Sequence, residues 1–259
     1  MRLYFVFFLL LCGCSQRIEE ARISQLDISA EEIRSLQVQR TKHFNELVGR
    51  GVIEFRWSDN RGKHKDQGDL DFWKQGKKVS IRISKLGELL MWFGGNDEQY
   101  WLFDLLGEET TLTLNSQHGI FTDINMALVL LGLSSLPQGE LTVQGNVVML
   151  VDENQREWAM EFDAATHRPL TIKVSDGENI SNAIHHKGIG VELKGLHALN
   201  WPYAGGLIDL SDSRGETEIK IAFSSLSTIV SDEPMERVFN LEYLEEALKP
   251  VWTRTAEDD

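Results

Sequence analysis

The feature of this sequence that most constrains its fold is a series of short segments, beginning near Gly51, in which apolar and polar side chains alternate. Alternation with a period of two is typical of β-strands that bury one face. The breaks between segments, such as Gln75-Gly76 and Gly94-Gly95-Asn96-Asp97, carry turn residues and are too short to hold the crossover helices of a parallel sheet. The sequence therefore predicts an antiparallel sheet with strands within 53–57, 69–72, 79–84, 89–93, 100–103, 145–151, 157–162, 170–174, 191–196, 207–210 and 218–223.

A helical pattern precedes the first strand. Ser29 and Glu32 have the spacing of a capping box, in which each side chain accepts a hydrogen bond from the other's backbone N–H. Apolar residues then recur at roughly helical spacing. This pattern predicts an amphipathic helix over about 30–48, stopped by Gly49 and Gly51.

Two further helical patterns follow. The segment 122–133 is apolar most of the way round, so we expect a nearly enclosed helix. A short helix is predicted within 239–250, ended by Pro250. The fold class is therefore a β-dominated α+β domain over residues 29–252, followed by an acidic tail over 253–259.

Charge and cysteine content argue against several classes of function. The chain has 26 basic and 40 acidic residues, a net charge of −14, which argues against binding to nucleic acid. Its two cysteines, Cys12 and Cys14, both lie near the N-terminus, so the rest of the chain has no disulfide framework, cysteine-based metal site or thiol nucleophile. We predict no bound metal and no cofactor.

The N-terminus has the pattern of a secretory signal. Arg2 precedes an apolar run over residues 3–11, which is too short to span a bilayer of about 20 helical residues. The stretch Leu11-Cys12-Gly13-Cys14 resembles a bacterial lipobox. This resemblance implies cleavage before Cys14 and acylation of that cysteine by chains such as palmitate. An ordinary secretory signal with a chance cysteine is the alternative.

The predicted domain organisation follows from the lipobox. Residues 1–13 are a lipoprotein signal peptide, and residues 14–28, which show neither periodicity, are a lipidated tether. More than one acyl chain suffices for stable attachment to a membrane. Because Ser15 and Gln16 follow the cysteine in place of an inner-membrane retention signal, the resemblance implies anchoring in the outer membrane, facing the periplasm.

The segment from Glu161 to Val174 resembles a unit of a known superfamily. Asp163 and Thr166 stand where they cap a turn, and Pro169 stands at the entry to the next strand. This strand, turn, proline, strand unit is similar to that of the bacterial outer-membrane lipoprotein-sorting (LolA/LolB-like) superfamily. The order of helices and strands over roughly residues 35–250 matches the same layout.

The resemblance implies a half-open barrel of about eleven antiparallel strands, with helices covering a concave face and an apolar cavity for acyl chains. Helices 30–48 and 122–133 would form the lid. No segment is identified as the exposed hydrophobic loop of LolB, and no arginine takes the role that one has in the soluble carrier. The strand at Tyr100 is apolar on both faces, so the side that faces the cavity stays open. The residues expected to line the cavity are Ile53, Phe55, Trp57, Leu70, Phe72, Ile81, Ile83, Trp92, Trp101 and Phe103. The same residues are equally compatible with a filled core.

Titratable residues point to no catalytic centre. His185 and His186 are adjacent in or beside a strand, so their side chains face opposite sides and cannot easily share a metal ion. Asp69 and Asp71 share a strand face, which suits paired-carboxylate chemistry but is better explained by solvation. The basic turns Lys77-Lys78 and Arg61-Gly62-Lys63-His64-Lys65 are interpreted as protection of hairpin tips and edges from pairing with other chains. For the cluster at Arg61, contact with anionic headgroups is the alternative.

The sequence thus predicts a non-enzymatic, lipid-anchored envelope protein. Its partners would be a lipid or an acylated protein, held in a hydrophobic cavity as by a carrier or acceptor, and a membrane through the N-terminal anchor. The alternative is a structural or sensory interaction module on the same scaffold with a filled core. An enzyme is the least favoured hypothesis, because no catalytic spacing occurs.

Overall fold

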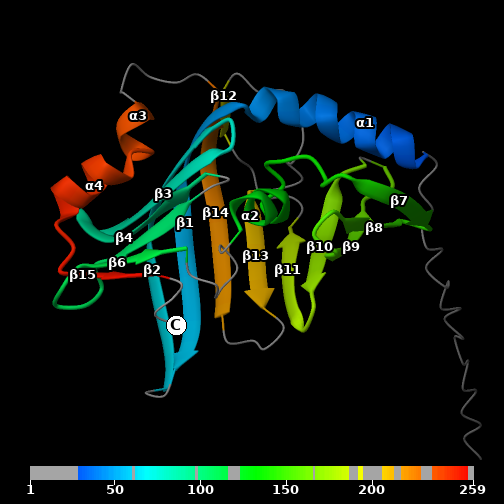
Figure 1. The fold of residues 1–259 in the computed structure, drawn as a ribbon. Coiled ribbons are helices and arrows are strands. Elements are labelled where there is room, and N and C mark those ends of the chain that lie inside the picture. The colour runs from blue at the N-terminus through cyan, green and yellow to red at the C-terminus, as the bar shows by residue number, and fades with distance from the viewer. Residues whose placement is uncertain are drawn as a thin grey trace, which may run out of the picture.

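A computed structural model describes residues 29–59, 62–96, 99–115, 123–165, 167–186, 192–194, 206–212, 217–228 and 235–255. Its strands form one curved, unclosed sheet of 15 strands, accompanied by a few short helices (Figure 1). The strand order is β15-β6-β5-β4-β3-β2-β1-β14-β13-β11-β10-β9-β8-β7, with β12 beside β14. The pairs β15–β6 and β12–β14 are parallel, and the other pairs are antiparallel. The predicted β-dominated α+β class is confirmed.

The bounds of the elements show how much of the chain the sheet takes up. The helices are α1 (Ala30–Thr41), a 3-10 turn η1 (Lys42–Phe44), α2 (Ile124–Leu130), α3 (Met235–Val238) and α4 (Leu241–Leu248). The strands are β1 (Glu46–Asp59), β2 (Gly62–Gln75), β3 (Lys78–Lys85), β4 (Glu88–Gly95), β5 (Tyr100–Asp104), β6 (Thr111–Leu114), β7 (Gly139–Gln144), β8 (Val147–Asp152), β9 (Glu157–Phe162), β10 (Pro169–Asp176), β11 (Asn179–His185), β12 (Glu192–Lys194), β13 (Leu207–Asp212), β14 (Thr217–Ser227) and β15 (Trp252–Arg254).

The first helix is shorter than predicted. The capping box at its start is present: Ser29 N donates to Glu32 Oε2 at 2.7 Å, and Glu32 N donates to Ser29 Oγ at 3.2 Å. The helix ends at Thr41, however, and β1 begins at Glu46, before the glycines that were expected to stop the helix.

Gly51 serves the sheet instead of ending a helix. A β-bulge between Arg50 and Gly51 shifts the register of β1 against β14. At Gly51 a Cβ would collide with the backbone carbonyl of Ala222 on β14. The absence of a side chain therefore allows the two backbones to approach where β1 bends.

Four strands fall outside the predicted set: β11, of which the sequence suggested only that His185 lies in or beside a strand, and three short strands. β6, β7 and β15 pair at or near the edges of the sheet, where partner strands and α1 determine their position. β15 occupies residues at the beginning of the predicted acidic tail. Segments of three to six residues carry too little alternation to be recognised without their partners.

The two faces of the sheet bury different clusters. The larger cluster, which we call the core face, includes Phe72 and Ile81 on neighbouring strands and five of the seven residues of α2. A smaller cluster on the opposite face brings Leu244 of α4 against Phe103 and Leu112. Figure 1 shows α2 in front of the sheet, α1 across one end of the strands, and α4 beside β15.

Gly94 leaves room for a buried side chain of the smaller cluster, so substituting it tests the fold. A Cβ at Gly94 would lie 2.5 Å from Cζ2 of the buried Trp101 indole. We expect Gly94→Ala to lower the free energy of unfolding by about 1–3 kcal/mol because the indole has to move. Gly107→Ala is the matched control, since its nearest neighbour would be 3.6 Å away. Urea unfolding of both variants checks this, and equal stabilities would contradict the packing described.

Candidate functional site

Seven of the residues expected to line a cavity share the core face. The register places Phe72 beside Ile81, and Leu70 beside Ile83. Ile53 lies opposite Gly68 on β2 and Ile221 on β14. The members of this group are Ile53, Phe55, Trp57, Leu70, Phe72, Ile81 and Ile83, and Trp57 is the one that packs at the margin of the cluster.

The other three expected residues lie on the opposite face. Trp101 and Phe103 pack in the cluster beneath α4, and Trp92 packs against it. Tyr100 contacts the core face instead, which decides the orientation of β5 that the sequence left open. The physical reason is that α4 supplies a second apolar surface, so both sides of this strand can be buried.

The helix α2 lies against the core face and nearly fills the space beneath it. Ala127 and Leu128 face Ile81 and Phe93 of β3 and β4, and the hollow between them measures about 10 Å³. A volume of this size holds at most one water molecule. α2 occupies seven residues, Ile124–Leu130, within the predicted segment 122–133.

Polar contacts hold both ends of α2. At its start, the Asp123 carboxylate accepts hydrogen bonds from Asn125 N and Met126 N, and it pairs with Arg156 Nη1 at 2.5 Å. At its end, Nε2 of His185 lies 2.9 Å from the carbonyl oxygen of Leu130. Because a carbonyl can only accept, Nε2 carries the proton and donates it. The helix is thereby tied to β11 as well as to the β8–β9 turn.

His185 is uncharged in this position. Burial lowers its pKa from 6.5 to about 4, and the hydrogen bond to Leu130 opposes this shift only in part. His186 lies on the other side of the strand, where Nε2 is 3.0 Å from Asp209 Oδ2. The two histidines therefore face opposite sides, as predicted.

The shift of the His185 pKa makes stability depend on pH. Below pH 6.5 the unfolded chain binds a proton that the folded chain does not bind until about pH 4. Stability is therefore lost as the pH falls through this window, by about 3 kcal/mol for this group. His185→Gln keeps an N–H donor but has no titratable group. In urea titrations we therefore expect the free energy of unfolding of this variant not to show the decrease between pH 6.5 and pH 4.

The neighbouring histidine provides the control for that measurement. His186→Gln should keep the loss, because His186 is on the outer face and does not contact α2. Equal acid sensitivity of the wild type and His185→Gln would contradict the assigned role of His185.

The helix α1 lies across one end of the strands and contributes Ile33 to the core (Figure 1). The side-chain oxygen of Gln37 accepts a hydrogen bond from Leu136 N at 3.2 Å. Arg34 donates to the carbonyl oxygens of Pro137 and Gly139, at 3.2 and 2.6 Å. Two hollows flank this helix: one of about 620 Å³ lies between α1 and β7, and one of about 400 Å³ lies beside Lys74.

Lys74 and Leu86 have environments that sequence reasoning missed. The side chain of Lys74 is buried on the core face, two positions after Phe72. Leu86 is 97% exposed at the turn between β3 and β4, with a positive φ of 54°. The signals in the sequence were a lysine at a position that the alternation assigns to the core, and a leucine beside Gly87 in a turn.

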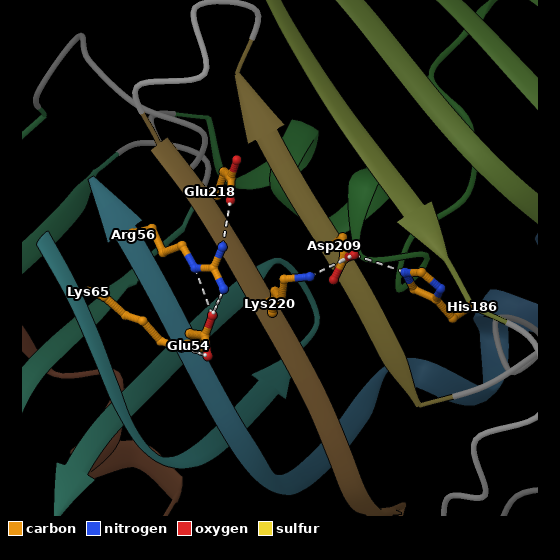
Figure 2. Close-up of polar contacts among 7 residues, drawn as sticks. All are labelled: Glu54, Arg56, Lys65, His186, Asp209, Glu218 and Lys220. Atoms are coloured by element: carbon orange, nitrogen blue, oxygen red, sulfur yellow. Dashed lines mark hydrogen bonds and ion pairs between the residues drawn. The ribbon is translucent and has the colours of Figure 1, made fainter. Parts of the chain in front are cut away.

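The outer face carries a ladder of charged side chains. Figure 2 shows Lys65, Glu54, Arg56 and Glu218 in ion pairs across three neighbouring strands, with Lys65 Nζ 2.8 Å from Glu54 Oε2. A second set joins Lys220, Asp209 and His186. Side chains in such ladders neutralise one another while remaining partly solvated.

The paired carboxylates and the basic turns belong to this outer surface. Asp71 pairs with Arg82 at 2.6 Å, whereas Asp69 is exposed, so the two do not act on a common atom. Lys77 and Lys78 are exposed at the β2–β3 turn. Arg61 lies outside the described residues.

The described residues contain no group of three or more His, Cys, Asp or Glu side chains that could hold a metal ion. Among them, no helix is both long enough and apolar enough to cross a membrane. Cys12, Cys14 and Thr166 lie outside the described residues. In the turn that suggested the superfamily, Asp163 N donates to Arg168 O and Pro169 begins β10.

No protein-family model matches the sequence, and no curated protein matches it. Solved structures share the fold. A domain from Vibrio parahaemolyticus described as an outer membrane lipoprotein-sorting protein has a TM-score of 0.54 and 10% identity, covering 84% of this chain and 100% of that chain. A LolA superfamily protein from Nitrosomonas europaea has a TM-score of 0.50 and 11% identity, covering 83% and 99%. A DUF1329 family protein from Desulfovibrio piger has a TM-score of 0.52 and 11% identity, covering 84% and 98%. The expected resemblance to the lipoprotein-sorting superfamily is confirmed at the level of the fold.

Proposed function

We propose that this chain is a lipid-anchored envelope protein that shelters an acyl chain, or the acyl chain of a lipoprotein, against the core face of its sheet. It acts as a carrier or acceptor, without making or breaking covalent bonds. The observation that carries this proposal is the unclosed curved sheet, with the short helix α2 packed against part of its apolar inner face. The shared fold with lipoprotein-sorting proteins supports it.

α2 is the element that would make room for an acyl chain. Six of its seven residues are buried, so its contribution to the core is a set of alkyl side chains from a helix of only two turns. An incoming acyl chain that displaces these side chains buries a comparable apolar area, at about 25 cal/mol per Å². The free energy of exchanging the α2 side chains for an acyl chain is therefore close to zero, which suits a protein that both accepts and releases cargo.

The exposed side chain of Leu86 supports the proposal that the protein accepts an acyl chain from a membrane or another protein. This side chain projects from the β3–β4 hairpin into solvent, and leucine is an unfavourable residue for a positive φ. An exposed apolar side chain in a strained turn has no role in stabilising the core. We infer that it makes the first contact with an acyl chain or with the membrane that presents it.

A matched pair of substitutions tests the acyl site. Leu128→Ala removes a buried side chain beneath α2, and Leu112→Ala removes an equally buried one beneath α4 on the opposite face. Both should cost about 2–5 kcal/mol of stability through the cavity they leave. Only Leu128→Ala should tighten the uptake of a fluorescent fatty acid, by about tenfold or ~1.4 kcal/mol.

The uptake experiment uses the full chain with Cys14→Ser, so that no covalent acyl chain competes. Native mass spectrometry of the same sample identifies any lipid that remains bound after purification. A chain that takes up no fatty acid and carries no lipid contradicts the carrier function. Equal uptake by the two leucine variants contradicts the placement of the chain beneath α2.

Membrane attachment through Cys14 is a separate part of the proposal. In a bacterial host, labelling with an alkyne analogue of palmitate should mark the wild-type chain and the Cys12→Ser variant. Cys14→Ser should lose the label and move from the membrane fraction, because its remaining cysteine, Cys12, lies within the predicted signal peptide and is not the lipobox cysteine. Label retained in Cys14→Ser would exclude this anchor. Separation of inner and outer membranes then locates the labelled protein.

A filled-core interaction module is the second candidate, and one observation favours it. The hollow beneath α2 is only about 10 Å³, whereas a larger hollow of about 490 Å³ lies on β7–β10 beside Met149, Val151 and Ala159. On this hypothesis the inner face is structural and partners bind outside. Absence of lipid uptake together with a stable, fully folded chain would favour it over the carrier.

A further inference from the structure

Lys74 is a charged residue on the apolar core face. It follows Leu70 and Phe72 on the same side of β2, and its neighbour on β1 is the fully buried Leu47. The side chain is only 6% exposed. A buried ammonium group is costly unless its hydrogen-bonding capacity and its charge are both met.

The hydrogen bonds of Lys74 are partly met by the backbone. Nζ donates to the carbonyl oxygen of Phe44 at 2.8 Å and to that of Gly76 at 2.7 Å. An ammonium group has three N–H donors, so these two bonds leave one for a further acceptor. Carbonyl dipoles orient the group but do not neutralise its charge.

The charge of Lys74 has no carboxylate partner in the described part of the chain. The hollow of about 400 Å³ beside it is lined by neutral polar residues, among them Asn45, Ser134 and Ser135, and by a second, exposed lysine, Lys42. None of the residues lining it is Asp or Glu. In a chain with 40 acidic residues, this is a distinctly cationic pocket.

The energetics of the pocket favour an anion. Burial lowers the pKa of Lys74 from 10.5 to about 8, so the group is still charged at neutral pH, at a cost in desolvation. An anion bound beside Nζ would offset that cost and accept the remaining hydrogen bond. Val38 and Leu133 supply apolar contacts in the same hollow.

We propose that Lys74 and its neighbours bind the oxyanion head of a single-chain lipid, a carboxylate or a phosphate. Leu133 lines this pocket, and its backbone N donates to the carbonyl oxygen of Leu128 in α2, so the pocket lies beside the C-terminal end of that helix. A lipid whose head lies at Lys74 could therefore extend its alkyl chain toward the space beneath α2. This inference rests on the proposed acyl-binding function and names the class of lipid that it selects.

The experiment compares three ligands with the same alkyl chain and different heads: hexadecanoic acid, hexadecyl phosphate and hexadecan-1-ol. Each displaces an uncharged fluorescent alkyl probe from the full chain carrying Cys14→Ser. In this background we expect at least one of the two anionic ligands to bind about tenfold or more tightly than the alcohol at neutral pH. The preference between carboxylate and phosphate identifies the head.

Two lysine variants in the same background locate the site. Lys74→Met removes the charge and keeps the length of the side chain, and it should reduce the preference for the anion to about twofold or less. Lys78→Met, at an exposed position of the β2–β3 hairpin, should leave the preference unchanged. Equal binding of the acids and the alcohol before either substitution overturns the headgroup site but leaves the acyl-binding function intact. Failure of all three ligands to displace the probe, with no uptake of the probe itself, contradicts the acyl-binding function.

A second measurement does not depend on the folding of a variant. The pKa of Lys74, followed by NMR of its side-chain carbons, should start near 8 and rise by about one unit or more when the preferred anion is added. Hexadecan-1-ol should leave it unchanged. A bound anion that does not move this pKa would place the head elsewhere and overturn the proposal.

Discussion

The pairing of β1 with β14 is the interaction on which the rest of the structure depends. It brings the N-terminal strands, β1 to β6, edge to edge with the strands of the C-terminal half, β7 to β14. The register runs from Val48 opposite Ser227 to Trp57 opposite Thr217, over nearly the whole length of β1. Because such a long-range pairing is entropically costly to form, it needs the apolar contacts of Ile53 and Ile221 that it creates.

That single sheet gives the protein two chemically different faces. The core face is apolar and α2 packs against part of it, whereas the outer face carries the charge ladders of Glu54 and Asp209. The polar groups that do enter the core face have specific tasks. His185 is neutral and binds the end of α2, and Lys74 is charged and lies at an open hollow. The proposed function uses this asymmetry, with an alkyl chain inside and an oxyanion at the margin.

The expected cavity residues show where strand alternation predicts the face on which a side chain lies and where it does not. Strand alternation put Leu70, Phe72, Ile81 and Ile83 together correctly, because each strand has one clearly apolar side and register couples neighbouring strands. Alternation could not assign the two sides of β5 to opposite faces, because both sides of this strand are apolar. The opposite orientation of Trp101 follows from α4, a helix from the far end of the chain that provides a second surface to bury against.

By itself, the sequence determined the fold class, the antiparallel order of most neighbouring strands, the capping box at Ser29 and the opposite orientations of His185 and His186. These follow from local periodicity and local hydrogen bonding. Only the tertiary structure decided where α1 ends, which face Trp101 takes, how completely α2 fills the inner side, and that Lys74 lies buried without a carboxylate beside it in the described residues. Each of these depends on contacts between segments far apart in the chain. A local sequence pattern does not specify which distant segment will pack against it or how far away that segment's side chains will lie.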